Sequence, residues 1–200
     1  SATGLLTVTR ASVGYIDNLA GEWSPVGAGL LRWSNKGALI EEARTNSIRN
    51  NSMQGAVAGS PGTQPTNWFI TANGTGGLTR TLSFGTDTTS IEYAGVRFGT
   101  SASGGTTYQI EAESGNGAIA AAYGQTWTGS AFVALAAGSL ANITNIEIGF
   151  DEYNGGTFLA SHLSTDFKAS LSTVLARKTF SFTPTNPATT SIRGPYVQIV

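Results

Sequence analysis

Residues 146–153, IEIGFDEY, alternate apolar and polar side chains, and this alternation decides the fold class. In an extended chain, successive side chains point to opposite sides. One side of this segment is apolar and carries Ile146, Ile148 and Phe150. The other side carries Glu147, Gly149, Asp151 and Tyr153. The pattern predicts a β-strand whose apolar side faces a core.

The same two-residue period recurs along the chain between clusters of turn residues. We expect eight strands, at residues 67–72, 77–84, 90–99, 106–114, 125–137, 143–154, 174–184 and 191–200. The 26 glycines and the low charge fit an all-β protein with many turns. Short helical turns are expected only at residues 115–125 and 164–173, the second capped by Ser164 or Thr165. This spacing predicts an antiparallel two-sheet β-sandwich, and we favour a jelly roll over an immunoglobulin-like topology.

The first 45 residues are predicted to form a short β arm rather than a domain. Strand patterns or apolar runs occur at residues 5–10, 13–17, 29–33 and 37–42. So short a segment buries too little surface for a core of its own. We therefore expect residues 1–45 to pack on a sandwich formed by residues 46–200.

The composition excludes several classes of protein. The 200 residues carry a formal net charge of −1, too little positive charge for a general nucleic-acid-binding surface. There is no cysteine, which excludes a disulfide scaffold, a thiol nucleophile and a cysteine-ligated zinc site. No apolar run approaches the roughly 18 residues of a membrane span, so we expect no membrane insertion. The chain shows no signal-peptide pattern and opens without Met, as a fragment of a longer protein would.

Three of the predicted strands, if they share one sheet, build a polar face suited to a sugar. That face carries Tyr93, Arg97, Gln109, Glu111, Glu147, Asp151 and Tyr153, with Gly95 and Gly149 leaving space between them. Aromatic rings stack on the C–H face of a sugar, while charged groups bind its hydroxyls. Our candidate ligand-binding residues on this face are Tyr93, Arg97, Glu111, Asp151 and Tyr153. The same set also describes an ordinary solvated sheet face, and this alternative stays open.

The four tryptophans divide into two pairs. Trp68 and Trp127 begin strands that are predicted to be buried, so we expect them in the core. Trp23 and Trp33 lie in glycine-rich segments, where an exposed ring is expected. They are either outlying ligand-binding rings or the contact by which the arm packs on the sandwich or on a neighbouring subunit.

Enzyme and metal signatures are weak. His162 is the single histidine, and no GxSxG motif accompanies it. A glycosidase needs two carboxylates at a defined separation, and Glu111 with Asp151 or Glu147 is a pair that any acidic sheet face offers. Asp17, Asp87 and Asp151 lie near turns, where β-sandwiches hold structural calcium, but no EF-hand spacing is present. We therefore predict no enzyme and assign no catalytic residue, metal site or cofactor.

Residues 40–55, IEEARTNSIRNNSMQG, combine charge with side-chain amides in an otherwise weakly charged chain. We interpret this segment as an ordered turn in which side chains satisfy the backbone. The proposed capping groups are those of Arg44, Asn46, Asn50 and Asn51, and Glu41 or Glu42 is expected to pair with Arg44 or Arg49.

The chain resembles bacteriophage and prophage tail or fibre proteins from about Val8 to its end. The resemblance rests on GALIEEARTNSIRNNSM (37–53), GAVAGSPGTQPTNW (55–68), YAGVRFGT (93–100) and GQTWTGSAFVALAAGS (124–139). It implies a carbohydrate-binding-module-like jelly roll on a virion or another extracellular surface, with a polysaccharide or cell-surface glycan as partner. It also implies assembly as a homo-oligomer such as a trimer or into a larger virion structure.

Three functions follow from these observations. The first is a non-catalytic, lectin-like carbohydrate-binding module of a phage-type protein. The alternative is a structural virion module that makes subunit contacts without binding a glycan. The third is a carbohydrate-active enzyme.

Overall fold

The computed structural model describes residues 14–17, 23–28, 30–34, 37–39, 46–86, 92–99 and 107–200. The chain divides into two compact units, Ser1–Thr45 and Asn46–Val200. In the first unit, β1 (Gly14–Asp17) pairs antiparallel with β2 (Trp23–Val26), and β3 (Arg32–Ser34) pairs antiparallel with β4 (Gly37–Leu39). The strand expected at residues 5–10 lies outside the described residues.

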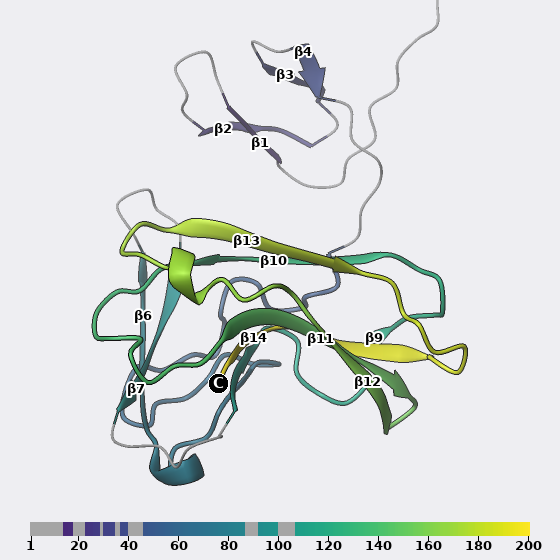
Figure 1. Ribbon diagram of the computed structural model, residues 1–200. Helices are drawn as coiled ribbons and strands as arrows, with labels where there is room; N and C mark the ends of the chain where they lie inside the picture. Colours follow the sequence, from purple (N-terminus) through teal and green to yellow (C-terminus); the bar gives the residue numbers. More distant parts are fainter. Residues whose placement is uncertain are drawn as a thin grey trace, which may run out of the picture. The chain divides into compact units, whose positions relative to one another are not determined.

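The second unit is built of β-strands, as the alternation predicted (Figure 1). Its strands are β5 (Phe69–Ile70), β6 (Thr79–Thr86), β7 (Glu92–Gly99), β8 (Tyr108–Glu111), β9 (Ile119–Ala120), β10 (Trp127–Val133), β11 (Ile146–Asn154), β12 (Thr157–Leu163), β13 (Ala176–Phe182) and β14 (Ser191–Ile199). Two 3₁₀ turns accompany them, η1 (Thr75–Gly77) and η2 (Lys168–Ser170). The expected all-β class is confirmed.

One sheet of six strands forms the main layer. Its order is β12-β11-β14-β8-β5, with β9 also paired to β14, and every pair is antiparallel. The C-terminal strand β14 therefore lies at the centre, between β11 and β8. This position brings residues that are about 40 to 90 positions apart in the sequence into adjacent strands.

The antiparallel β10–β13 ribbon packs over β11 and β14 as a second layer (Figure 1). The Phe150 ring of β11 stacks on Phe182 of β13 at 4.7 Å between centroids. A core cluster forms around this pair, containing Ile119, Ala121, Phe150, Phe182 and Ile192. Gly129 of β10 admits the close approach, because a Cβ there would lie 2.6 Å from Cβ of Pro195. The result is a β-sandwich, while the jelly-roll topology stays a prediction.

The condition for the polar face, that three predicted strands share one sheet, is met by β8 and β11 but not by β7. Strand β7 pairs with β6 in a separate ribbon, and β14 separates β8 from β11. Alternation defines which residues share a face of a strand but carries no information about which strands pair. The β6–β7 ribbon meets the main sheet through Phe98, whose ring stacks on Tyr108 at 5.4 Å.

Three local expectations also need correction. Strand β12 was not predicted, although Gly155 and Gly156 join it to β11 in a two-residue hairpin. The Ala-rich segment 115–125 contains β9 instead of a helical turn. The turn expected at 164–173 exists as η2, but Phe167 stands at its N-cap without a side-chain hydrogen bond.

The segment after the first unit is an ordered turn, as predicted. The Asn50 amide donates to the carbonyls of Gln54 and Thr66 at 2.9 and 2.6 Å, and its oxygen accepts from the Gln54 N–H at 2.8 Å. Asn46 accepts from the N–H of Ile48. Arg49 pairs with the fully buried Glu113, a partner that the sequence did not suggest. Arg44, Glu41 and Glu42 lie outside the described residues.

Candidate functional site

The candidate site lies on the face of the main sheet opposite the Phe150 cluster. Three residues from adjacent strands are direct neighbours across this face: Phe69 of β5, Glu111 of β8 and Tyr196 of β14. Directly opposed residues of antiparallel strands point to the same side. The ladder therefore places an aromatic ring, a carboxyl and a phenol in one row.

Arg193 joins this row because the β11–β14 ladder is irregular. The register shifts between Gly149 and Asp151, so that Tyr196 opposes Gly149 and Arg193 opposes Asp151. A strict two-residue alternation would place Arg193 and Tyr196 on opposite faces. The irregularity instead brings both side chains to Asp151.

Asp151 is the anchor behind the site. Its carboxylate accepts hydrogen bonds from the Tyr196 hydroxyl at 2.8 Å and from Ser161 at 2.6 Å. Arg193 donates to it from Nε at 3.0 Å and also from one terminal nitrogen. Burial and the Asp151 charge raise the pKa of Tyr196 above its ordinary value, so the phenol stays protonated and acts as a donor. Asp151 thereby fixes the orientation of Arg193.

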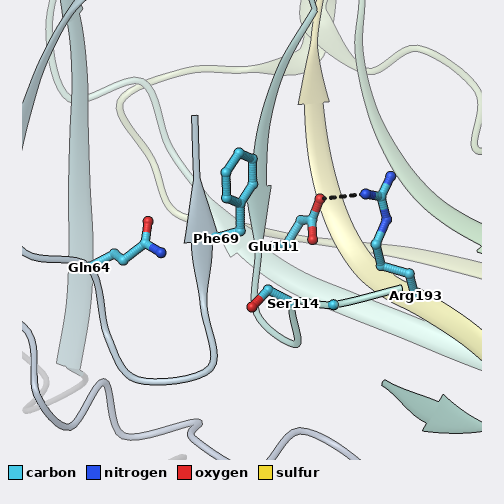
Figure 2. A pocket seen from close by; sticks show the side chains of 6 residues that line it. Gln64, Phe69, Glu111, Ser114 and Arg193 are labelled. Atoms are coloured by element: carbon cyan, nitrogen blue, oxygen red, sulfur yellow. Dashed lines mark ion pairs between the residues drawn. The ribbon is translucent and has the colours of Figure 1, made fainter. Parts of the chain in front are cut away.

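The other terminal nitrogen of Arg193 points toward Glu111, 3.5 Å from Glu111 Oε1 (Figure 2). The guanidinium also lies near the rings of Tyr196 and Tyr153, at 5.7 and 6.0 Å from their centroids. Although Glu111 is only 2% exposed, its Oε1 accepts no hydrogen bond from any described residue. Burial raises the pKa of Glu111, and the Arg193 charge partly opposes this. A buried carboxylate oxygen without a hydrogen bond is costly, and the Arg193 charge offsets part of this cost.

A pocket of about 260 Å³ opens beside this pair (Figure 2). It is lined by Gln64, Phe69, Glu111, Ser114, Gly115 and Arg193. Phe69 is 39% exposed and supplies the apolar surface. The Gln64 amide is already engaged, since it donates to the Trp68 carbonyl and accepts from the Ile70 N–H. The other polar side chains of the lining are those of Ser114, Glu111 and Arg193.

The site residues predicted from the sequence lie in the main sheet, in the β6–β7 ribbon and in the first unit. Glu111 lines the pocket, whereas Asp151 and Tyr153 are 1% and 4% exposed. The expectation that these three residues share a solvated face is therefore wrong. The side chains of Arg193 and Tyr196, on the neighbouring strand β14, contact them on that face. Asp151 and Tyr153 contact the Arg193 guanidinium, Asp151 through hydrogen bonds and Tyr153 through its ring.

The remaining candidates are not among the residues that line the pocket. Tyr93 and Arg97 are exposed on β7, in the separate β6–β7 ribbon. Trp23 begins β2 and Trp33 lies in β3, both in the first unit. Trp127 packs against the core cluster as expected, and half-buried Trp68 donates its indole N–H to the Asn50 carbonyl.

Sequence reasoning missed five pocket residues: Gln64, Phe69, Ser114, Gly115 and Arg193. Phe69 was assigned to a strand, but nothing in its surroundings distinguishes an exposed ring from a core ring. Arg193 lies in the alternating segment SIRGPYV, and its inward orientation depends on the register shift. Strand pairing brings Phe69 and Arg193 close to Glu111, whereas Gln64 and Ser114 lie outside the strands.

Another buried carboxylate, Glu152, lies on the opposite face of β11. It accepts hydrogen bonds from both the N–H and the hydroxyl of Thr185, the N–H of Asn186 and the hydroxyl of Thr189. His162 of β12 contacts it as well, and the imidazole stacks on Phe182. Burial by itself would raise the pKa of Glu152, but the hydrogen bonds to its ionised form have the larger combined effect and lower this pKa to about 2. This cluster fastens the loop before β14 to β11, which makes its role structural.

Within the described residues, no three acidic or histidine side chains gather closely enough to hold a metal ion. Asp87, one of the suggested calcium ligands, lies outside those residues, and the Asp151 oxygens are occupied by Arg193, Tyr196 and Ser161. None of the described elements is a helix with the length and hydropathy needed to cross a bilayer.

Comparison with protein-family models, with curated proteins and with solved structures finds no match to this chain. The functional argument therefore depends on the pocket.

Proposed function

We propose that the chain is a non-catalytic carbohydrate-binding module and that the Phe69–Glu111–Arg193 pocket is its ligand-binding site. An exposed ring beside a carboxylate and a guanidinium matches the two needs of sugar recognition, stacking on C–H groups and hydrogen bonding to hydroxyls. The observation that carries the proposal is the ion-paired Glu111 and Arg193, which line an open pocket together with the exposed ring of Phe69.

The pocket supports binding better than catalysis. A glycosidase acts through two carboxyl groups that both reach the substrate or its water. Glu111 is the one acidic residue among those that line the pocket. Asp151 is buried and is hydrogen-bonded to Arg193, Tyr196 and Ser161. One reachable carboxyl group suits a binding site.

The biological setting follows from the resemblance described above. We place the module on a phage-type tail or fibre, where it meets a host or environmental polysaccharide. A shallow pocket gives weak binding per site, which an oligomeric fibre strengthens through multivalency.

A structural virion module is the second candidate. Exposed apolar side chains occur at one end of the β10–β13 ribbon, where β10 ends and β13 begins. They are Phe132, Val174 and Leu175. Such side chains are frequent in subunit contacts. Light scattering coupled to size-exclusion chromatography tests this function, since it requires a stable oligomer that Phe132→Glu disrupts.

Affinity electrophoresis through a panel of bacterial and plant polysaccharides tests the primary proposal. We expect one or more polymers to retard the protein, and Phe69→Ala to abolish the retardation. Tyr123→Ala is the control, because Tyr123 is also an exposed aromatic residue but does not line the pocket. Retardation that survives Phe69→Ala would refute this site, and the absence of retardation by every polymer would refute the function.

A further inference from the structure

The hydrogen-bonding groups of the pocket form a donor–acceptor pair. Arg193 uses Nε and one terminal nitrogen on Asp151, and its other terminal nitrogen donates no hydrogen bond within the described part of the chain. That nitrogen lies 3.5 Å from Glu111 Oε1, which likewise has no hydrogen bond. The pocket is therefore lined by one residue with a charged donor and one with a charged acceptor, and these two residues form an ion pair.

Two hydroxyls on adjacent carbons of a sugar ring match this pair. Each hydroxyl both donates and accepts, so one can donate to Glu111 while its neighbour accepts from Arg193. Hydrogen bonds to charged groups are the stronger kind, and two of them together fix the orientation of the ring. Phe69 opposes Glu111 across the ladder and supplies a surface for the C–H groups of the same sugar.

The charge of the site favours a neutral sugar. With all three groups ionised, Glu111 and Asp151 together carry one more negative charge than Arg193 neutralises. The guanidinium edge formed by Nε and one terminal nitrogen is already used on Asp151, and the other terminal nitrogen lies beside the Glu111 carboxylate. An anionic sugar that approaches this remaining nitrogen would meet the negative charge of Glu111.

We propose that the pocket recognises two adjacent free hydroxyls of a neutral sugar unit, held between Glu111 and Arg193 with the ring against Phe69. This inference rests on the proposed carbohydrate-binding function and specifies its ligand class. The inference predicts that binding depends on the linkage and charge of a sugar polymer rather than on its overall composition.

Polysaccharides of known linkage test it with the full 200-residue chain. Dextran, xylan and β-(1→4)-mannan are neutral and keep adjacent hydroxyls free. A β-(1→3)-glucan is neutral but has no adjacent free pair in its internal units, and polygalacturonate has the pair together with a carboxylate. We expect retardation by at least one of the first three polymers and none by the last two.

Glu111→Gln provides the matching variant, because it keeps the size of the side chain and removes its charge. We expect it to weaken binding about tenfold, the loss typical of one charge-assisted hydrogen bond. Thermal unfolding confirms that the variant is folded, and the polymer series with the unmodified chain tests the inference independently of it.

Each outcome has a distinct meaning. Equal retardation by the β-(1→3)-glucan would overturn the adjacent-hydroxyl inference and leave carbohydrate binding intact. Stronger retardation by polygalacturonate would overturn the neutral-sugar assignment. Unchanged affinity in folded Glu111→Gln would overturn the role of Glu111. Failure of all polymers to retard the protein would overturn the proposed function together with the inference.

Discussion

Phe69 of β5 and Glu111 of β8 are direct partners in the antiparallel ladder, and Glu111 is in turn the partner of Tyr196 in β14. This pairing places a half-exposed ring next to a buried carboxyl at the rim of one pocket. The two residues lie more than forty positions apart in the sequence, so their juxtaposition is a product of strand order. The predictions below test this face of the sheet and the groups that support it.

Glu111 is expected to make the protein more stable at low pH. Its pKa is raised, so its favourable contribution is complete below the ordinary value of 4.5 and is lost as the pH rises through the raised pKa. Replacing Glu111 by Gln removes this loss. Urea unfolding should therefore show Glu111→Gln gaining stability relative to the unmodified chain between pH 4 and pH 7, and a relative loss over that interval would contradict the burial argument.

Glu152 is expected to behave in the opposite way. Its pKa is lowered from 4.5 to about 2, so its stabilising contribution is present above the ordinary value and is lost as the pH falls toward 2. A shift of this size corresponds to roughly 3 kcal/mol of pH-dependent stability. Glu152→Gln should destabilise most at pH 7 and progressively less toward pH 3. A cost that is independent of pH, measured by urea unfolding, would show that the hydrogen bonds do not favour the ionised form.

Gly149 is expected to tolerate no side chain. A Cβ at this position would overlap the ring of Tyr196, which fills the space that the sequence suggested for a ligand. Gly149→Ala should displace Tyr196 from Asp151 and destabilise the protein by about 1–3 kcal/mol. Gly156→Ala is the matched control, since a Cβ added there would meet no atom within 4 Å, and its effect should stay within about 0.5 kcal/mol. Equal free energies of unfolding for the two variants would contradict the close packing.

Asn50 is expected to require its amide. The side-chain nitrogen donates to two carbonyls, and an aspartate at this position would have no donor for either of them. Asn50→Asp should therefore destabilise the second unit by about 2 kcal/mol or more at pH 7. The exposed neighbour Asn51 provides the control, because Asn51→Asp should change the melting temperature little. Similar melting temperatures for both variants would show that the turn does not depend on this amide.

Local pattern was sufficient for the class of the fold and for most strands. The alternation in IEIGFDEY predicted β11 and the burial of Ile146, Ile148 and Phe150, all of which the structure shows. It failed for the opposite side of the same strand, where Asp151 and Tyr153 are buried as well. A polar residue in an alternating strand is expected to face solvent unless another element supplies its partners, and here that element is β14.

The hydrophobic period of the sequence by itself determined that this chain forms β-strands, because side-chain alternation is a property of each strand alone. It also determined which residues of Ile146–Asn154 face the aromatic core. Only the tertiary structure decided that β14 enters between β8 and β11 and shifts register at Gly149–Asp151. Strand order and register depend on contacts between segments far apart in the chain, and those contacts bring Phe69, Glu111 and Arg193 to one pocket.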